Sequence, residues 1–183
     1  MAITTLDGPV RSLNGFYTQG PGSAIALSTT ADTTLTVAQH AGHILTFAGG
    51  ALGANRTITL PAVNTSADPV SAGPGSDPNT NNNIGVTFTI WITGTISANQ
   101  LKIGTASASG DIYTGSVVVV DSDTAGTING YVPNGTSNDF INLTSTSGGI
   151  AGSWLVITSL AANRYAVQGV LLGTTPATPF ADS

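Results

Sequence analysis

The stretch that decides the fold class is Val86-Thr87-Phe88-Thr89-Ile90-Trp91-Ile92. Every second side chain, beginning with Val86, is large and apolar, and threonine fills two of the three positions between them. Successive side chains of a strand point to opposite faces of a sheet, so this alternation predicts a strand with one face on a core. β-Branched and aromatic residues also favour strands.

Shorter runs of the same kind lie on both sides of this stretch, separated by Gly, Pro, Asn and Asp, which are turn residues. Only a single turn near Ala38–Gly42 has any helical character. The runs are residues 24–27, 34–37, 44–47 and 57–60 before the stretch, and 101–103, 117–120, 140–143, 154–157 and 165–170 after it. Short, regularly spaced strands predict an all-β protein, either an antiparallel β-sandwich or a jelly-roll-like barrel.

Two local features refine this prediction. Four consecutive valines, residues 117–120, are typical of a strand that is covered on both faces. Ala161-Ala162-Asn163 separates the last two runs and predicts a hairpin turn between them.

The distribution of Pro and Gly predicts the domain organisation. Residues 1–22 contain Pro9, Pro21 and several glycines without a sustained period, which predicts an extended N-terminal arm. Residues 23–173 form the β-sandwich domain, and 174–183 form a C-terminal tail. Within the domain, residues 62–83 hold three prolines and an asparagine run, which predicts a long loop. We expect the arm and the loop to contact neighbouring subunits.

Composition narrows the possible functions. Charged residues make up only 7% of the chain, cysteine is absent, and the four cations, Arg11, Arg56, Lys102 and Arg164, are scattered. Proteins bind nucleic acid through clustered Lys and Arg, so we expect no direct nucleic-acid partner. The N-terminus does not resemble a secretory signal, and no apolar run approaches the ~20 residues needed to span a bilayer. We therefore expect a chain that is soluble when it is made and does not associate with a membrane.

Two groups of residues are candidate metal ligands. His40 and His43 lie three residues apart, but a zinc site needs further ligands that the sequence does not supply, so we interpret them as polar turn residues. Asp121-Ser122-Asp123 resembles the start of a calcium loop but lacks its glycine and its distant glutamate. Asp111 and Asp139 could add ligands to a cation site there only if folding brings them close to Asp121 and Asp123. The prediction is a solvated turn and no metal site.

Catalytic sites receive little support from the sequence. A pair of aspartates would suit a glycosidase, but nothing separates one pair of the nine from ordinary turn residues. Gly152-Ser153-Trp154 lacks the context of a nucleophile elbow, so Ser153 is interpreted as the start of a strand. We predict a non-enzymatic protein with no catalytic, cofactor-binding or metal-binding residues and no cofactor.

The aromatic residues leave two readings open. Aromatic side chains in strands are usually core or interface anchors, and a sugar-stacking face is the alternative. Trp154 and Tyr165 lie on the predicted closing hairpin, where a contact across the two strands is expected. The residues concerned are Trp91, Trp154, Tyr113, Tyr131 and Tyr165.

The order of these segments resembles β-rich structural proteins of tailed bacteriophages, both capsid decoration (cement) proteins and domains of head or tail fibres. The resemblance covers roughly residues 33–173. It rests on a threonine-rich strand ending in Leu60-Pro61, a loop, the aromatic strand at 86–92, Gly110-Asp111, and a Gly-x-Trp strand at 152–157 before the closing hairpin. The loop at 62–83 is longer than this pattern usually has, and no fibre shaft flanks the domain.

The resemblance implies a structural virion protein on the capsid exterior. It would bind the phage major capsid protein, bridge adjacent subunits and stabilise the shell, as a homotrimer made in the host bacterial cytoplasm. The compact length favours decoration. The alternative that the resemblance leaves open is a head-fibre or tail-fibre domain that binds a host receptor or glycan.

Overall fold

The computed structural model describes residues 24–65, 82–106, 110–123 and 127–182. The predicted N-terminal arm, residues 1–22, lies outside the described residues. So does most of the predicted loop, of which residues 62–65 and 82–83 are described.

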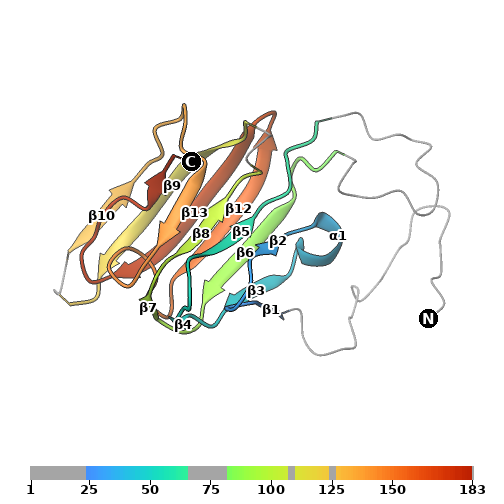
Figure 1. Ribbon diagram of the computed structural model, residues 1–183. Coiled ribbons are helices and arrows are strands. Elements are labelled where there is room, and N and C mark those ends of the chain that lie inside the picture. The colour runs from blue at the N-terminus through green and yellow to red at the C-terminus, as the bar shows by residue number, and fades with distance from the viewer. Residues whose placement is uncertain (1–23, 66–81, 107–109, 124–126, 183) are drawn as a thin grey trace, which may run out of the picture.

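The largest element of the described chain is a seven-stranded sheet, which we call the large sheet (Figure 1). Its alternating burial follows the sequence: in strand β6, Phe88, Ile90 and Ile92 are buried and the residues between them are not. In order across the sheet, the strands are β1 (Ala24–Leu27), β3 (Ile44–Phe47), β6 (Thr87–Ile92), β12 (Trp154–Ala161), β13 (Arg164–Gly173), β9 (Ile112–Asp121) and β10 (Ile128–Tyr131).

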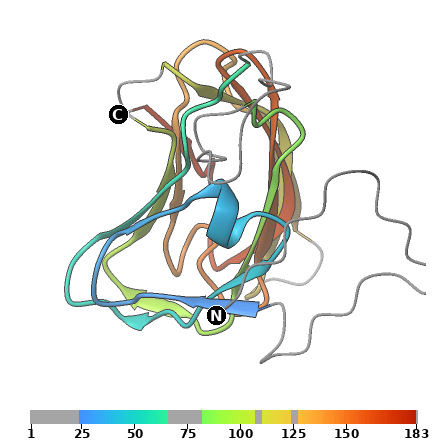
Figure 2. The ribbon, with the colours of Figure 1, turned by 90° about the vertical axis from the view of Figure 1, so that its right-hand side faces the viewer.

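A five-stranded sheet, the small sheet, faces the large one, and Figure 2 shows the two as facing layers. Its strands, in order, are β14 (Phe180–Ala181), β11 (Phe140–Leu143), β8 (Leu101–Gly104), β5 (Arg56–Thr59) and β2 (Thr33–Thr34). A further two-stranded sheet consists of β4 (Gly50–Ala51) and β7 (Ile96–Ala98). In the chain, each of these strands follows a strand of the large sheet and precedes a strand of the small sheet. Residues 180–181, predicted to lie in a C-terminal tail, instead pair with β11.

The N-terminal half of the described chain is a short parallel coil. The chain alternates between the sheets, through β1 and β2, then β3, β4 and β5, then β6, β7 and β8. Ile44 pairs with Thr89 and Arg56 pairs with Leu101, a separation of 45 residues in both sheets. Each turn of the coil therefore lies on the preceding one, as in a β-helix.

Two glycines allow the coil to turn its corner. A Cβ added at Gly94 would overlap the carbonyl oxygen of Ala48, and one added at Gly49 would overlap the carbonyl of Gly94. The Thr93 N–H donates to the Phe47 carbonyl at 2.9 Å, which ties the two turns together beside this point. The close approach of the two backbones leaves no room for a side chain.

The all-β prediction is confirmed, but the purely antiparallel pairing is wrong. Among the described strands, β1–β3, β3–β6, β2–β5, β5–β8, β4–β7 and β9–β13 are parallel. A chain that passes through the opposite sheet before returning re-enters in the same direction, whereas a hairpin reverses it. In the described part, the large sheet ends at β1 and β10 and the small sheet ends at β14 and β2, so no closed barrel forms.

Two predicted local features are confirmed, and the prediction that the valine strand is covered on both faces is wrong. The hairpin β12–β13 turns at Ala162-Asn163, where Asn163 has φ +59°. The helical turn α1 (Val37–His40) matches the expectation near residues 38–42. Of the four valines, Val117 and Val119 are buried, whereas 37% of the Val118 side chain is exposed, so this strand is covered on one face only.

The core fills the space between the two sheets. Its largest fully buried side chains are Tyr113, Tyr165, Phe47 and Phe88. The Tyr113 hydroxyl donates to the Ile103 carbonyl at 3.0 Å, and the Tyr165 hydroxyl donates to the Pro61 carbonyl at 2.5 Å. Each tyrosine therefore fills the core and also bonds a segment beyond its own sheet.

Candidate functional site

The outer face of the large sheet carries both tryptophans of the chain. Trp91 in β6 lies directly opposite Trp154 in β12, with ring centroids 6.2 Å apart and ring planes inclined by 25°. The alternating burial of both strands places their neighbours Ile90, Ile92 and Leu155 in the core and the indoles outside, with 38% of Trp91 exposed. We call this pair the tryptophan platform.

A hollow of about 320 Å³ lies next to the platform on the same face. Val156, two residues after Trp154, pairs with Gln168, and Gln168 pairs with Ser116. Small lining residues, including Gly115, Ser116 and Ala166, leave this space open, which larger side chains would fill. The hollow is lined by seven residues without charge: Gly115, Ser116, Val156, Thr158, Ala166, Val167 and Gln168.

Gly115 is required by the backbone at this point. Its φ is +101°, and a Cβ there would overlap the carbonyl oxygen of Val167 in β13. Both observations favour glycine, which has no Cβ and adopts positive φ readily. The floor of the hollow is therefore fixed by the pairing of β9 with β13.

One edge of the large sheet exposes aliphatic side chains. Among the described strands, β10 pairs with β9 alone, and 62% of Ile128, at its start, is exposed. Val118 in β9 is 37% exposed, and Val132, just after β10, is 70% exposed. We call Val118, Ile128 and Val132 the edge patch.

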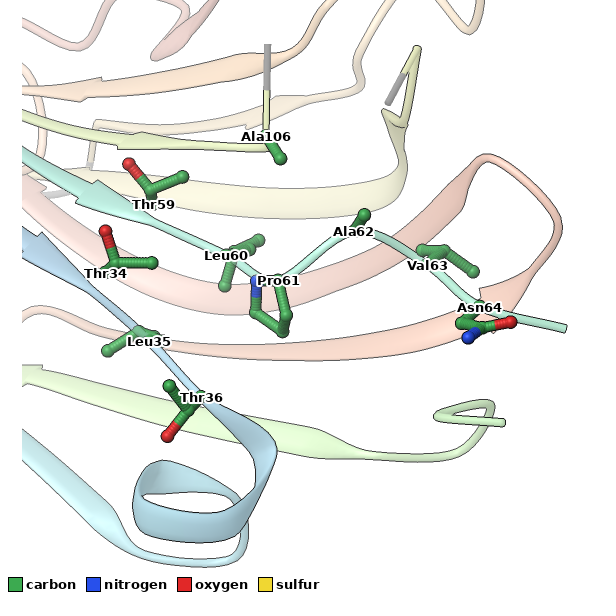
Figure 3. A pocket seen from close by; sticks show the side chains of 10 residues that line it. All are labelled: Thr34, Leu35, Thr36, Thr59, Leu60, Pro61, Ala62, Val63, Asn64 and Ala106. Atoms are coloured by element: carbon green, nitrogen blue, oxygen red, sulfur yellow. The ribbon is translucent and has the colours of Figure 1, made fainter. Parts of the chain in front are cut away.

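A second cavity, of about 620 Å³, lies where β2 and β5 end, beside α1 (Figure 3). Its lining is mainly apolar, from Leu35, Leu60, Pro61 and Val63, with threonine hydroxyls at Thr34, Thr36 and Thr59.

Buried polar groups hold the wall of this cavity. The Asp111 carboxylate accepts the Val63 N–H at 2.8 Å, and the Asn83 side chain bonds the backbone of Ala62 and Asn64 at 2.8 and 2.9 Å. Burial raises the pKa of Tyr165, and the negative charge of Asp111 raises it further. The Tyr165 hydroxyl thus remains a proton donor to Pro61.

The residues considered as metal ligands have local bonds in the structure. His40 Nδ1 accepts the Thr36 N–H at 3.0 Å, within the turn that begins α1. Asp121 accepts the Asp123 N–H at 2.8 Å, the pattern of an Asx turn, as predicted. Within the described ranges, no cluster of three or more His, Cys, Asp or Glu residues is placed to hold a metal ion.

The considered nucleophile, Ser153, is buried and directly precedes β12. Its hydroxyl oxygen accepts the Leu172 N–H at 2.8 Å. This bond joins the start of β12 to β13, which is a structural role close to the predicted one.

The aromatic residues divide between two environments. Tyr113 and Tyr165 are buried in the core and Tyr131 packs against it, as one of the two readings predicted. Both tryptophans lie outside the core. The expected contact between Trp154 and Tyr165 is wrong, because Trp154 pairs with Val170 and Tyr165 with Ser159, on opposite faces of the hairpin.

The sequence contained one signal for the tryptophan platform. In the stretch at 86–92, Trp91 shares its parity with Thr87 and Thr89, whereas the other apolar residues share the opposite parity. The sequence alone therefore places Trp91 on the polar face of its strand. For Trp154 the parity is ambiguous, since both faces of its strand contain apolar residues.

Comparison of the chain with protein-family models, with curated proteins and with solved structures found no match. In the part of the chain that the structure describes, no helix has the length and apolar character needed to cross a membrane.

Proposed function

We propose that the chain is a non-enzymatic structural protein of a tailed-phage particle, a capsid decoration protein with a sandwich-like fold. It binds the outer surface of the capsid, bridges adjacent major capsid protein subunits as a homotrimer and stabilises the shell. The observation that carries the proposal is the edge patch, three aliphatic side chains exposed at an open sheet edge.

An open sheet edge with exposed aliphatic side chains favours association. The outward backbone groups of an edge strand can pair with another chain, and natural proteins usually protect such edges with charges or prolines. Strand β10, with the sequence Ile-Asn-Gly-Tyr, has neither. Burying a side chain such as Ile128 against a partner contributes about 1.5–3 kcal/mol, and a trimer repeats the contact and gains avidity.

A second candidate function is a head-fibre or tail-fibre domain that binds a host receptor or glycan. The tryptophan platform is the specific observation in its favour, because it places two adjacent indoles outside the core, one of them 38% exposed, where a ligand could cover them.

Replacing Ile128 with lysine tests the decoration role. We expect Ile128→Lys to weaken binding to heads assembled without the protein by about tenfold or more, because a charge replaces an apolar contact. Binding is measured by co-sedimentation with purified heads, and cryo-electron microscopy locates the bound protein. A matched control is Leu160→Lys, at the far end of β12, where 54% of the side chain is exposed.

The control should bind heads as the unmodified protein does. Equal binding by Ile128→Lys would remove the edge patch from the interface. If the unmodified protein does not bind heads and is found on tails or at one vertex, the fibre reading replaces the decoration reading.

A further inference from the structure

The tryptophan platform and the hollow form one continuous surface. Trp154 and Val156 are two residues apart on the same face of β12, so the platform borders the wall that Val156 contributes to the hollow. Gln168 and Ser116 continue the row from Val156 across β13 and β9. A ligand lying across β6, β12, β13 and β9 would touch both parts.

The chemistry of this surface is aromatic and polar but uncharged. The indole faces carry negative quadrupole density, which attracts the weakly positive C–H groups on the face of a sugar ring. The hydroxyls of Ser116 and Thr158 and the amide of Gln168 both donate and accept hydrogen bonds, as sugar hydroxyls require. Gln168 and Ser116 are exposed and thus accessible.

We infer that this surface is a binding site for a neutral oligosaccharide. One sugar ring stacks on the tryptophan platform, and the next occupies the hollow, where Gln168, Ser116 and Thr158 bond its hydroxyls. This site borders the edge patch, because Ser116 and Val118 lie two residues apart on the same face of β9, but its proposed ligand goes beyond attachment to a capsid.

Charge separates this ligand from the alternatives. An acidic polysaccharide or a nucleic acid requires cations at its binding site, and none lines the hollow or the platform. A protein partner would be favoured by a wholly apolar face, whereas three of the seven residues around the hollow carry hydroxyl or amide groups. A neutral, hydroxyl-rich ligand matches both properties.

Fluorescence reports directly on the site, because the chain has two tryptophans and both form the platform. The probes are neutral hexasaccharides of glucose, galactose, mannose and N-acetylglucosamine, with hexagalacturonate as the acidic comparison. We expect at least one neutral probe to change the tryptophan emission, with a dissociation constant on the order of 1 mM or lower. The acidic probe should not change it.

Variants assign the binding to this surface. Trp91→Ala and Gln168→Ala should each weaken the responsive neutral probe about tenfold or more, measured by calorimetry, while circular dichroism stays unchanged. The control is Thr175→Ala, an exposed residue in the connection between β13 and β14, which should bind as the unmodified protein does.

The inference is overturned if no neutral probe binds, or if Trp91→Ala binds the probe unchanged. It is also overturned if Trp91→Ala abolishes only self-association or head binding, which would assign the platform to a protein partner. Head binding is measured independently through Ile128→Lys. A protein that binds heads but no sugar therefore keeps the proposed function and loses this site.

Discussion

The Gly94→Ala protein is expected to lose about 3 kcal/mol or more of its free energy of unfolding. The added methyl group would overlap the Ala48 carbonyl oxygen on the preceding turn of the coil. That atom belongs to the backbone, so it cannot rotate away, and the two turns must separate. Their separation would strain the bonds on both sides, including the one from Thr93 to Phe47. Urea unfolding followed by circular dichroism measures the loss.

The matched control is Gly53→Ala, which lies between β4 and β5 on the preceding turn of the coil. A Cβ at Gly53 meets no atom within 4 Å, so its stability should change by less than about 1 kcal/mol. If Gly94→Ala is as stable as Gly53→Ala, the two turns do not stack at this corner, and the coil description fails there.

The folded protein should lose stability steeply as pH rises above about 10, the ordinary pKa of tyrosine. Burial raises the pKa of both Tyr113 and Tyr165, and nearby negative charge adds to the effect, from Asp139 at Tyr113 and from Asp111 at Tyr165. Below pH 10 both hydroxyls are protonated in the folded and unfolded states. Above it the unfolded chain releases these protons and the folded protein keeps them, so unfolding becomes more favourable.

The expected slope is about 1.4 kcal/mol per pH unit for each buried tyrosine. The free energy of unfolding, measured in urea at several pH values between about 9 and 11.5, gives this slope. Tyr113→Phe and Tyr165→Phe should each lower stability at neutral pH by about 1 kcal/mol through the lost hydrogen bond. Each should also remove one tyrosine's share of the slope. A slope unchanged in both variants would contradict the burial of these hydroxyls.

Local pattern predicted the strands well. The stretch at 86–92 corresponds to β6 (Thr87–Ile92), and the predicted turn at Ala161-Ala162-Asn163 joins β12 to β13. Both features depend on neighbouring residues, whose preferences are visible in the sequence. The resemblance to phage structural proteins, and the partners it implies, remain predictions.

The pairing of strands was predicted poorly, because pairing partners are far apart in the chain. An alternating strand has the same sequence pattern in parallel and antiparallel sheets, so alternation does not determine direction. A signal for the coil was present in the spacing. Leu45-Thr46-Phe47-Ala48-Gly49 and Ile90-Trp91-Ile92-Thr93-Gly94 share an apolar pattern that ends in glycine, 45 residues apart.

The sequence by itself determined that the chain is all-β, where its main strands lie, and that it carries little charge. These properties depend on side-chain chemistry and short-range order. Only the tertiary structure decided that strands of successive turns pair in parallel. It also decided that Tyr165 is buried in the core whereas Trp154 lies outside it. Finally, it placed Trp91, Trp154, Gln168 and Ser116 on one surface. The reason is that the face a strand turns inward depends on which strands lie beside it and which sheet lies opposite, and those contacts form between residues tens of positions apart.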